Sequence, residues 1–415
     1  MPDWPDRYSR QVRFAGIGEE GQAKLKASRV LVAGLGALGA SLAQHMVRAG
    51  VGKVVIVDRD YVEPSNLQRQ MLYDEEDALT SLPKAEAAAR KLRRMNSEIE
   101  VVAHVLDINE WNAAELVGGV DLVLDGTDNA ETRLLLSDSC YELGIPFLYG
   151  GVTGAQGMTA VLIPGETACL RCLIGGDEPK EDGDTCDTVG VISPAVELVA
   201  SLQAAEALKL LCGRDGELRR TWLSIELWPF RMREMGMPVG NPSCEYCGRS
   251  AEERQRGSLA GGRERAERQY VGQAASRGDA RVNLSDSSAV TASNRSGGQA
   301  DTGSRTWSEG RGGADTVILC GRDSVQVTLP GALNLAELGS RLEKLGLPMT
   351  INPYLVRVEL AAGERLVCFA EGRVLVQGTT DRQLAWELCE RWLMMEEGES
   401  GNERLARLGA VRDYG

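Results

Sequence analysis

Histidine and surplus positive charge are both scarce in this chain, and long apolar runs are missing. The 415 residues include only two histidines, His45 and His104, so we do not expect chemistry built on a histidine base. The net charge of −14 argues against nucleic-acid binding, which needs clustered basic charge. No apolar run approaches a membrane span, and the first residues lack the apolar core of a signal peptide. We therefore expect a cytoplasmic protein with no membrane or nucleic-acid partner.

The ten cysteines are too few and too scattered for a disulfide scaffold. Four of them form two C-x-x-C pairs, Cys169 with Cys172 and Cys244 with Cys247. Two such pairs can complete the four-sulfur shell of a structural Zn²⁺. The alternative is two unrelated pairs, one of them redox-active. Glu166 and a turn precede the first pair, where a thioredoxin-type motif has a strand end, so we predict a closed structural zinc site.

Strand and helix patterns alternate along residues 1–248. Alternation of this kind predicts a doubly wound, Rossmann-like α/β sheet with parallel strands. We place both the nucleotide site and the zinc site within residues 1–248. The predicted strands are 28–33, 54–57, 99–105, 121–124, 146–149 and 158–163, and the predicted helices are 38–49, 84–95, 130–143 and 194–211.

The composition changes after residue 248. Residues 249–313 are rich in Gly, Ser, Arg and acidic residues, and they cannot bury enough apolar area to offset an ordering cost of roughly 1–2 kcal/mol per residue. We predict a flexible linker there, with a frayed charged helix at 251–268 as the alternative. Strand and helix patterns return in 314–396, which predicts a small α+β domain followed by a flexible tail, 397–415.

A glycine-rich turn, GLGALG, follows the first predicted strand and opens a helix. Gly34, Gly36 and Gly39 would let backbone amides approach phosphate oxygens, and Ala37 immediately precedes the predicted helix 38–49, whose dipole favours an anion at this end. Asp58 ends the next strand and suits ribose hydroxyls. The pattern alone fits NAD, FAD, S-adenosylmethionine and ATP, and a turn that only packs helix on strand is a further alternative.

The segments that follow the turn favour ATP. DRDYVEPSNLQRQ (58–70) places Asn66 and Arg69 just beyond Asp58, and Lys84 stands at a predicted helix start. A triphosphate needs such cations, because its β and γ oxygens must be neutralised as pyrophosphate leaves. Hydride transfer has no such need. The alternative for Arg69 and Lys84 is solvated surface charge.

A second acidic segment, DGTDN (125–129), follows another predicted strand. Ligands of open α/β sheets bind at this strand edge, and the Asp128 carboxylate suits Mg²⁺, which takes oxygen ligands and bridges phosphates. The alternative is that Asp128 caps the helix starting at Ala130. The remaining nucleotide-site residues that we predict from these segments are Asp60, Ser65, Gln70, Thr127 and Asn129.

Together these motifs resemble the HesA/MoeB/ThiF family of ubiquitin-activating-type adenylyltransferases. Within this family, the chain is most similar to the adenylyltransferases of thiamine thiazole synthesis in Gram-positive bacteria, because these proteins also have a C-terminal module with matching segments. The long linker of this chain departs from the pattern of that subtype. The segments that carry the resemblance are RYSRQ (7–11), VAGLGALG (32–39), DRDYVEPSNLQRQ (58–70), LPKA (82–85), DGTDN (125–129), CLRC (169–172), TCDTVGVISP (185–194), CEYC (244–247), CGRDSVQV (320–327), NPYL (352–355) and GRVLVQGT (372–379).

The resemblance implies specific roles for single residues. Asp58 would hold the ribose of ATP, and Asn66, Arg69 and Lys84 would contact its phosphates. Asp128 would coordinate an essential Mg²⁺, and the four paired cysteines would bind Zn²⁺. Arg10 would reach the γ-phosphate in the neighbouring subunit of a homodimer. Without the resemblance, Arg10 reads as an N-terminal surface charge.

The implied reaction is adenylylation of a small ubiquitin-like sulfur-carrier protein ending in Gly-Gly, in thiamine thiazole synthesis. An α-carboxyl with a pKa of roughly 3.3–3.7 is already ionised at neutral pH, so no general base is required. Alternatives are the molybdopterin-synthase counterpart, an NAD-dependent oxidoreductase and a catalytically silent scaffold. No rhodanese-like segment is visible, so we expect a separate sulfur donor such as a cysteine desulfurase.

The remaining cysteines divide into two groups. Cys186 stands in a polar, glycine-rich segment, TCDTVG, and in part of the resembled family the matching thiol forms a covalent link to the activated carrier. The alternative is a bystander thiol. The others lie in apolar patterns that predict small buried hydrophobes, namely Cys140, Cys212, Cys320, Cys368 and Cys389.

Overall fold

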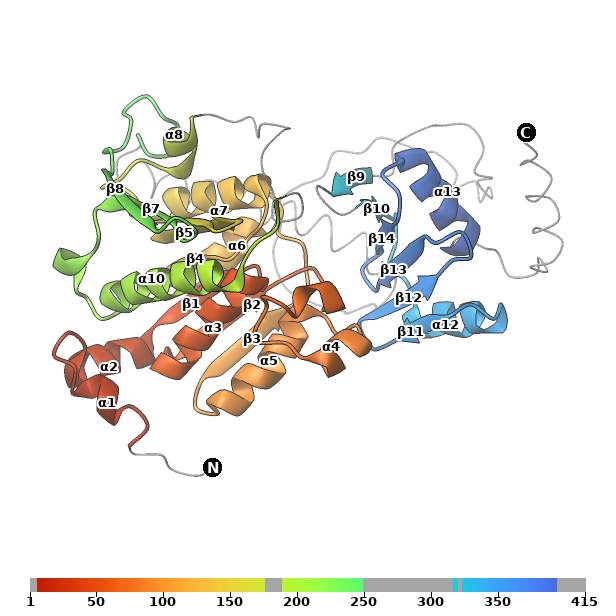
Figure 1. Cartoon of the computed structure of the whole chain (residues 1–415), viewed down its shortest axis with the longest axis horizontal. Helices are drawn as coiled ribbons and strands as arrows, with labels where there is room; N and C mark the ends of the chain where they lie inside the picture. The colour runs from red at the N-terminus through yellow and green to blue at the C-terminus, as the bar shows by residue number, and fades with distance from the viewer. Residues whose placement is uncertain (1–5, 176–188, 249–315, 320–322, 394–415) are drawn as a thin grey trace, which may run out of the picture. The chain divides into compact units, whose positions relative to one another are not determined.

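A computed structural model of the chain describes residues 6–175, 189–248, 316–319 and 323–393. These residues form an eight-stranded sheet and a six-stranded sheet (Figure 1). The described residues on both sides of 249–315 belong to one compact unit. The predicted linker and tail lie outside the described residues. Among the described helices, none has the length and apolar character needed to cross a bilayer.

The larger sheet has the strand order β3-β2-β1-β4-β5-β6-β7-β8. Strands β1 to β5 pair in parallel, and the last three are added antiparallel. The predicted doubly wound α/β sheet is thereby confirmed. The strands are β1 (Arg29–Ala33), β2 (Lys53–Val57), β3 (Glu100–His104), β4 (Leu122–Asp125), β5 (Phe147–Thr153), β6 (Gln156–Leu162), β7 (Thr221–Glu226) and β8 (Arg231–Gly236).

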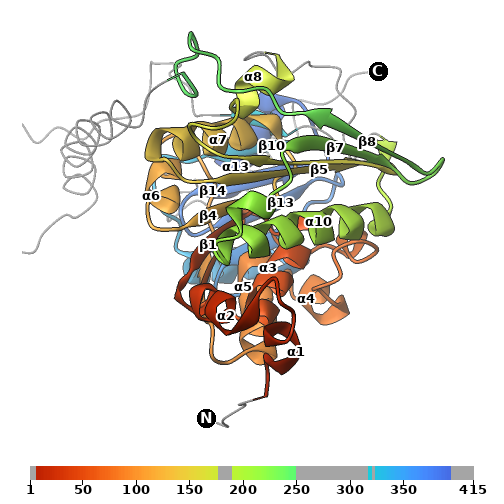
Figure 2. The same cartoon turned by 90° about the vertical axis from the view of Figure 1, so that its left-hand side faces the viewer.

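Helices cover both faces of this sheet (Figure 2). Alternate residues of β1 point to opposite faces, so Val30 packs in one apolar cluster and Leu31 in another. Burial on both faces explains why the parallel strands are continuous apolar runs. The first cluster includes residues of α2 (Gly18–Ala27), α3 (Ala37–Ala49), α5 (Lys84–Met95) and α10 (Ser193–Leu211), and the second includes residues of α6 (Ala113–Val117), α7 (Ala130–Leu143) and α8 (Leu170–Ile174).

The smaller sheet is antiparallel in the order β11-β12-β13-β14-β10-β9. Its core contains apolar residues of the strands and of both helices. The Asn334 side chain caps the first helix by accepting from Glu337 N. The elements are β9 (Thr316–Leu319), β10 (Ser324–Thr328), α12 (Leu335–Lys344), β11 (Met349–Ile351), β12 (Leu355–Glu359), β13 (Arg365–Phe369), β14 (Arg373–Gln377) and α13 (Arg382–Leu393).

Candidate nucleotide and metal sites

Three loops meet at the carboxyl ends of β1, β2 and β4. Strand β1 lies between the other two, so the sheet order reverses here and opens the crevice in which α/β proteins bind ligands. Gly34 N donates to Val57 O at 2.8 Å, and Gly126 N donates to Ala33 O at 2.8 Å. The glycine turn, the loop after Asp58 and the DGTDN loop are therefore neighbours, as the sequence predicts.

The glycine turn leaves no space for side chains at two of its positions. Gly34 has φ +80°, which favours glycine, and a Cβ on Gly39 would lie 1.8 Å from Gly34 O. Around Gly36, which precedes α3, a Cβ would meet only Gln70 Nε2, at 4.0 Å. The N-terminus of α3 is thus open to close approach by a phosphate.

Asp58 ties two loops together. Its Oδ2 accepts from Leu35 N at 2.6 Å, and its Oδ1 accepts from Asp60 N at 2.7 Å. Burial raises the pKa of Asp58, although the nearby Lys84 acts to lower it. A carboxylate offers about four acceptor positions, so hydroxyl groups of a ribose can still bond to Asp58.

Lys84 is the first residue of α5 and is almost completely buried, at 3% exposure. Its Nζ lies 3.1 Å from Asp60 Oδ2, and its backbone N donates to Asp60 O at 2.8 Å. Tyr73, also buried, donates from its hydroxyl to Leu35 O at 2.7 Å. Lys84 is therefore not a solvated surface charge. It is a buried cation with an acidic neighbour at the start of α5, and the Tyr73 hydroxyl, which also donates to Lys84 O at 3.3 Å, connects it to the glycine-turn region.

In the DGTDN loop Asp128 is exposed, whereas Thr127 and Asn129 form hydrogen bonds within the loop and to the start of α7. Thr127 donates from its N and its Oγ1 to Asp125 Oδ1, at 3.0 and 2.7 Å. Asn129 caps α7, because its side chain accepts from Thr132 N at 2.8 Å. The alternative that Asp128 caps this helix is therefore wrong. Asp128 is exposed.

Two cations flank Asp128 that the sequence reasoning did not single out. Arg59 pairs with Asp107, Nη1 to Oδ1 at 3.1 Å. Burial opposes the charge on Arg59, but Asp60, Asp107 and the Asp128 carboxylate raise its pKa. Arg59 therefore places positive charge beside the Asp128 loop, and this charge is shared with the neighbouring carboxylates of Asp60 and Asp107.

Arg133 holds the DGTDN loop in place from the first turn of α7. Its Nε lies 2.8 Å from Asp125 Oδ2, and its Nη2 donates to Thr127 O at 2.6 Å. Burial opposes the charge on Arg133, but Asp125 and Asp128 raise its pKa. A side chain on a helix leans toward the N-terminus of that helix. An arginine one turn after an acidic loop is therefore the sequence signal that could have revealed the role of Arg133.

We expect Arg133→Ala to lower the free energy of unfolding by about 3–5 kcal/mol, because the fully buried Asp125 carboxylate loses its cation. Urea titration followed by circular dichroism measures this loss. In an Asp125→Asn background the same substitution should cost clearly less. A loss below about 1 kcal/mol, the range of surface ion pairs, would contradict the buried-pair interpretation.

The remaining predicted residues occupy different environments. Asn66 and Gln70 are buried, and Gln70 Oε1 has no hydrogen-bond partner within the described part of the chain. Such an orphaned buried atom is compatible with a polar ligand near Gly36. Arg69 is half-buried and donates to Ser65 O at 3.1 Å. Arg10 is exposed on α1 (Ser9–Val12).

The four paired cysteines converge on one point. All four sulfur atoms lie within 4.8 Å of one another. Two of the sulfur–sulfur distances, Cys169 to Cys244 and Cys172 to Cys247, are 3.7 Å. Sulfurs about 2.3 Å from a common tetrahedral centre lie about 3.8 Å apart, so the cluster has the size of a zinc shell.

The surroundings of the cluster fix both C-x-x-C segments. The buried Tyr141 donates to Ala168 O at 2.8 Å, and Ala168 N donates to Pro238 O at 2.9 Å, which joins the two segments. Burial acts to raise the pKa of these thiols and raises that of Cys172 to about 12, whereas hydrogen bonds from the backbone of Cys247 and Tyr246 lower that of Cys244 to about 7. A coordinating cation reverses the effect of burial, because a metal-bound thiol is deprotonated. The donor set therefore fits Zn²⁺.

The structure describes four of the five cysteines that were predicted to be small buried hydrophobes. Cys140, Cys212, Cys368 and Cys389 are buried, which confirms the prediction for these four. Cys186 and Cys320 lie outside the described residues.

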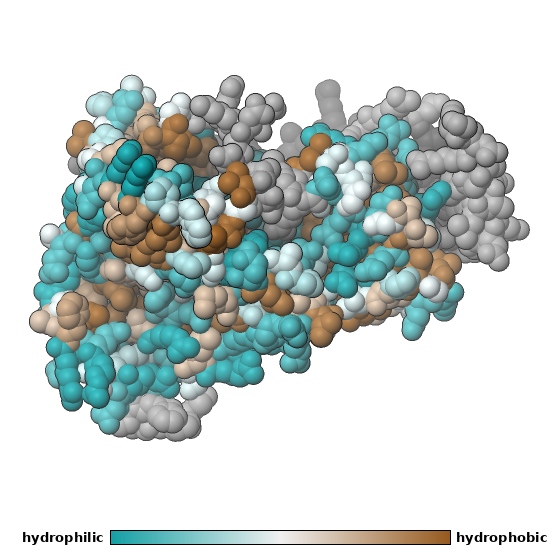
Figure 3. Space-filling view, viewed as in Figure 1, coloured by the Kyte–Doolittle hydropathy of each residue, from teal (hydrophilic) through white to brown (hydrophobic). Residues whose placement is uncertain are grey.

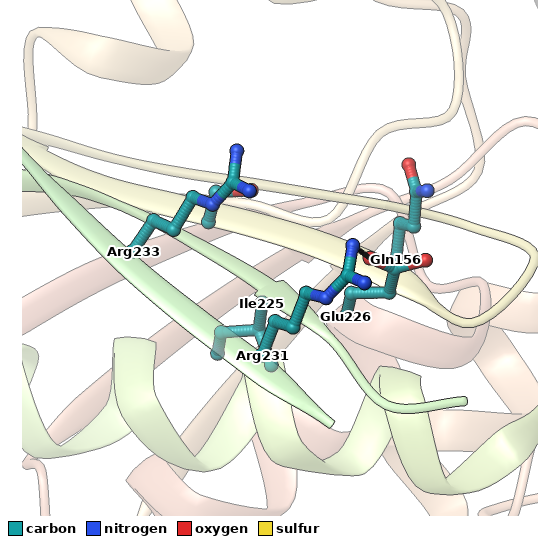
Figure 4. Close-up of a pocket in the computed structure, with 6 residues that line it drawn as sticks. Gln156, Ile225, Glu226, Arg231 and Arg233 are labelled. Carbon is teal, nitrogen blue, oxygen red and sulfur yellow. Dashed lines mark ion pairs between the residues drawn. The ribbon is translucent and has the colours of Figure 1, made fainter. Parts of the chain in front are cut away.

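A separate hollow opens on β6, β7 and β8, at the other end of the strand order (Figure 4). Gln156, Ser224, Ile225, Glu226, Arg231 and Arg233 line it, and Arg231 pairs with Glu226 at 3.8 Å. Hydrophobic residues also show on the surface in the region of β7 and α10 (Figure 3). No predicted nucleotide-site residue lines this hollow.

Comparison with known proteins decides the family. The ThiF family profile matches residues 8–246, more than half of the chain. The chain belongs to the ThiF family. This ThiF-family chain is 37% identical to the sulfur carrier protein ThiS adenylyltransferase of Bacillus subtilis over 392 residues, which cover 93% of the chain and 99% of that protein. It is also 39% identical to the SAMP-activating enzyme E1 of Haloferax volcanii, over 59% of the chain and 88% of that protein.

Solved structures show the same fold. E. coli MccB with ATP matches this ThiF-family chain with a TM-score of 0.51 at 24% identity, over 59% of the chain and 75% of MccB. MccB with MccA-N7isoASN matches with a TM-score of 0.52 at 23% identity, over 60% of the chain and 76% of MccB. The Rossmann-like fold is therefore confirmed.

Proposed function

We propose that this chain adenylylates the C-terminal glycine carboxylate of a small ubiquitin-like sulfur-carrier protein, with ATP as the AMP donor and pyrophosphate as a product. The observation that carries the proposal is the meeting of the Gly34 turn, Asp58 and the Asp128 loop at one edge of the sheet, where β1 separates β2 from β4. The nearly full-length similarity to a ThiS adenylyltransferase supports thiamine thiazole synthesis as the pathway.

ATP would lie across the three loops. The N-terminus of α3 would receive phosphate oxygens, and Asp58 would bond to the ribose hydroxyls. Asn66 and Arg69 would contact the phosphates. The Lys84 ammonium, which pairs with Asp60 at 3.1 Å, would be shared with the triphosphate. Catalysis would consist of positioning and charge stabilisation.

Asp128 is the residue that would hold Mg²⁺. Its carboxylate is exposed and provides the oxygen ligand that this ion prefers. Bound there, the ion would neutralise charge on the phosphates. Arg59 and Arg133 would stay beside this carboxylate, because the negative charge of Asp128 is one of the causes that raise the pKa of each arginine.

The attacking group would be the carrier's terminal carboxylate. At neutral pH it is already ionised, since its pKa is roughly 3.3–3.7, and it can displace pyrophosphate from the α-phosphorus without a general base. We further propose a homodimer in which Arg10 of each chain serves the neighbouring site. The exposed position of Arg10 supports this role. A separate protein, such as a cysteine desulfurase, would supply sulfur afterwards.

The test is exchange of labelled pyrophosphate into ATP with purified carriers ending in Gly-Gly. Exchange with a thiazole-pathway carrier supports the proposal, and exchange only with a molybdopterin-synthase carrier would transfer it to the counterpart pathway. Nothing in the comparisons favours an oxidoreductase. Tight binding of NAD with no binding of ATP would overturn the proposal.

Cys186 is expected to be dispensable for adenylation. The exchange reaction ends at the acyl-adenylate, before any thiol could attack it. Cys186→Ala should therefore leave the exchange rate within about twofold of wild type. Loss of a general acid or base would instead lower the rate by roughly 10²-fold or more. The same variant, assayed for sulfur transfer to the carrier, reports on a covalent role. Collapse of exchange would show that this thiol acts during adenylation.

We also propose that the four-cysteine cluster binds one structural Zn²⁺. All four ligand positions would be filled by sulfur, so no position remains for a reacting water. The ion would connect the first turn of α8 to the segment after β8.

A further inference from the structure

The C-terminal sheet contacts the loops that carry Asp60 and Lys84. The first contact is apolar and centres on Tyr61, which is 2% exposed. Its ring belongs to one cluster with Leu355, Val367, Phe369 and Leu375, which come from β12, β13 and β14. The residue next to Asp60 is therefore packed into the face of the second sheet.

A buried arginine adds a polar contact to the same loop. Arg373 Nη2 donates to Arg59 O at 2.6 Å. The guanidinium lies 3.7 Å from the centre of the Phe369 ring, and the Arg373 side chain is only 5% exposed. A charged donor fixed on an aromatic face and shielded from water gives a strong and directional bond.

A third contact holds the turn before Lys84. Asn352 Nδ2 donates to Thr80 O and Ser81 O, at 3.0 and 3.1 Å, and Arg357 Nη1 donates to Ser81 Oγ at 2.7 Å. The Asn352 side-chain oxygen accepts from two backbone N–H groups of its own turn, at 2.9 and 3.0 Å. The orientation of this amide is therefore fixed before it meets the turn.

Ser81 has φ +49°, in the left-handed region, and is completely buried. A non-glycine residue in this conformation persists where its surroundings over-determine it. Ser81 stands three residues before Lys84, and the two loops are joined by Val62 N to Leu82 O, at 2.9 Å. Movement of the Ser81 turn would therefore displace Lys84.

We infer that the C-terminal module positions Lys84 for the phosphates of ATP by fixing both loops that carry the Lys84–Asp60 pair. Asn352 and Arg373 are the positioning residues. This inference rests on the proposed function, because it assigns Lys84 to the triphosphate. It gives the module of 316–393 a part in nucleotide binding although none of its residues needs to touch the nucleotide.

The experiment compares ATP and adenosine binding to the full chain by calorimetry. Asn352→Asp keeps an oxygen acceptor for its own turn and removes the donor to Thr80 and Ser81. We expect ATP to bind roughly tenfold more weakly, the equivalent of one or two hydrogen bonds, with adenosine affinity within about twofold. The matched control is Arg382→Ala, an exposed arginine on α13, which should change neither affinity.

A second pair of variants guards against misfolding. Arg373→Ala should weaken ATP selectively, and Arg373→Lys, which retains a donor, should restore part of the loss. Equal weakening of ATP and adenosine, or no weakening in either variant, would overturn the inference. Wild-type protein that failed to bind ATP would instead reject the proposed function, and the inference would fall with it.

Discussion

Replacing Asp128 with alanine is expected to abolish carrier-dependent exchange between ATP and pyrophosphate while the chain stays folded. Asp128 would be the Mg²⁺ ligand, and loss of one preorganised electrostatic contact usually costs about 10²–10³ in rate. Loss of the ion itself would remove more. The fold should survive because Asp128 is exposed, and α7 is capped by Asn129.

The matched control for this variant is Glu131→Ala. Glu131 is an exposed acidic residue in the first turn of α7, so its removal changes the local charge equally without removing the proposed ligand. We expect near-wild-type exchange from Glu131→Ala and a titration of Mg²⁺ that no longer restores Asp128→Ala. Exchange by Asp128→Ala above about a tenth of wild type would refute the magnesium role, given the size of effect expected above.

Replacing Cys244 with serine is expected to reduce zinc from one ion per chain to almost none and to lower the melting temperature sharply. Structural zinc contributes roughly 10–16 kcal/mol of binding free energy in zinc-finger peptides, which is comparable to the whole stability of a domain. Here the loss falls on the two segments that the sulfurs join, and Cys169 and Cys247 also belong to an apolar core cluster.

Metal analysis by mass spectrometry and a thermal melt measure the two effects. Ser243→Ala, an exposed neighbour in the same segment, should retain the zinc and the melting temperature. Chelation of the wild type should reproduce the melting temperature of Cys244→Ser. Unchanged metal stoichiometry in Cys244→Ser would reject the four-sulfur site.

The sequence predicts the larger fold well because parallel strands carry a simple signal. Buried on both faces, β1 and β2 read as apolar runs, and α5 and α7 begin and end where predicted, at Lys84–Met95 and Ala130–Leu143. By contrast, β8 (Arg231–Gly236) is exposed at every position. Because no face of β8 is buried, its sequence has neither the apolar run nor the apolar–polar alternation that predicts a strand, and the sequence analysis does not include it.

The nucleotide site shows a similar division. Motif spacing places Asp58, Lys84 and Asp128 at one edge, since the carboxyl ends of parallel strands share that edge. It does not reveal that Lys84 pairs with Asp60, or that Arg133 supports the loop. The contact of Asn352 with Ser81 joins residues 271 positions apart, and local periodicity carries no information about such a pair.

The four-sulfur cluster has a consequence for biosynthesis. Its two halves are separated by 75 residues, and at roughly 5–20 residues per second the ribosome would need some seconds to deliver Cys244 after Cys169. During that interval the nascent chain has only Cys169 and Cys172, and two thiols bind a zinc ion more weakly than four. The long helix α10 and the strands β7 and β8 are synthesised between the two cysteine pairs. Zinc binding would therefore stabilise this part of the protein only after most of the large sheet and its helices have been synthesised.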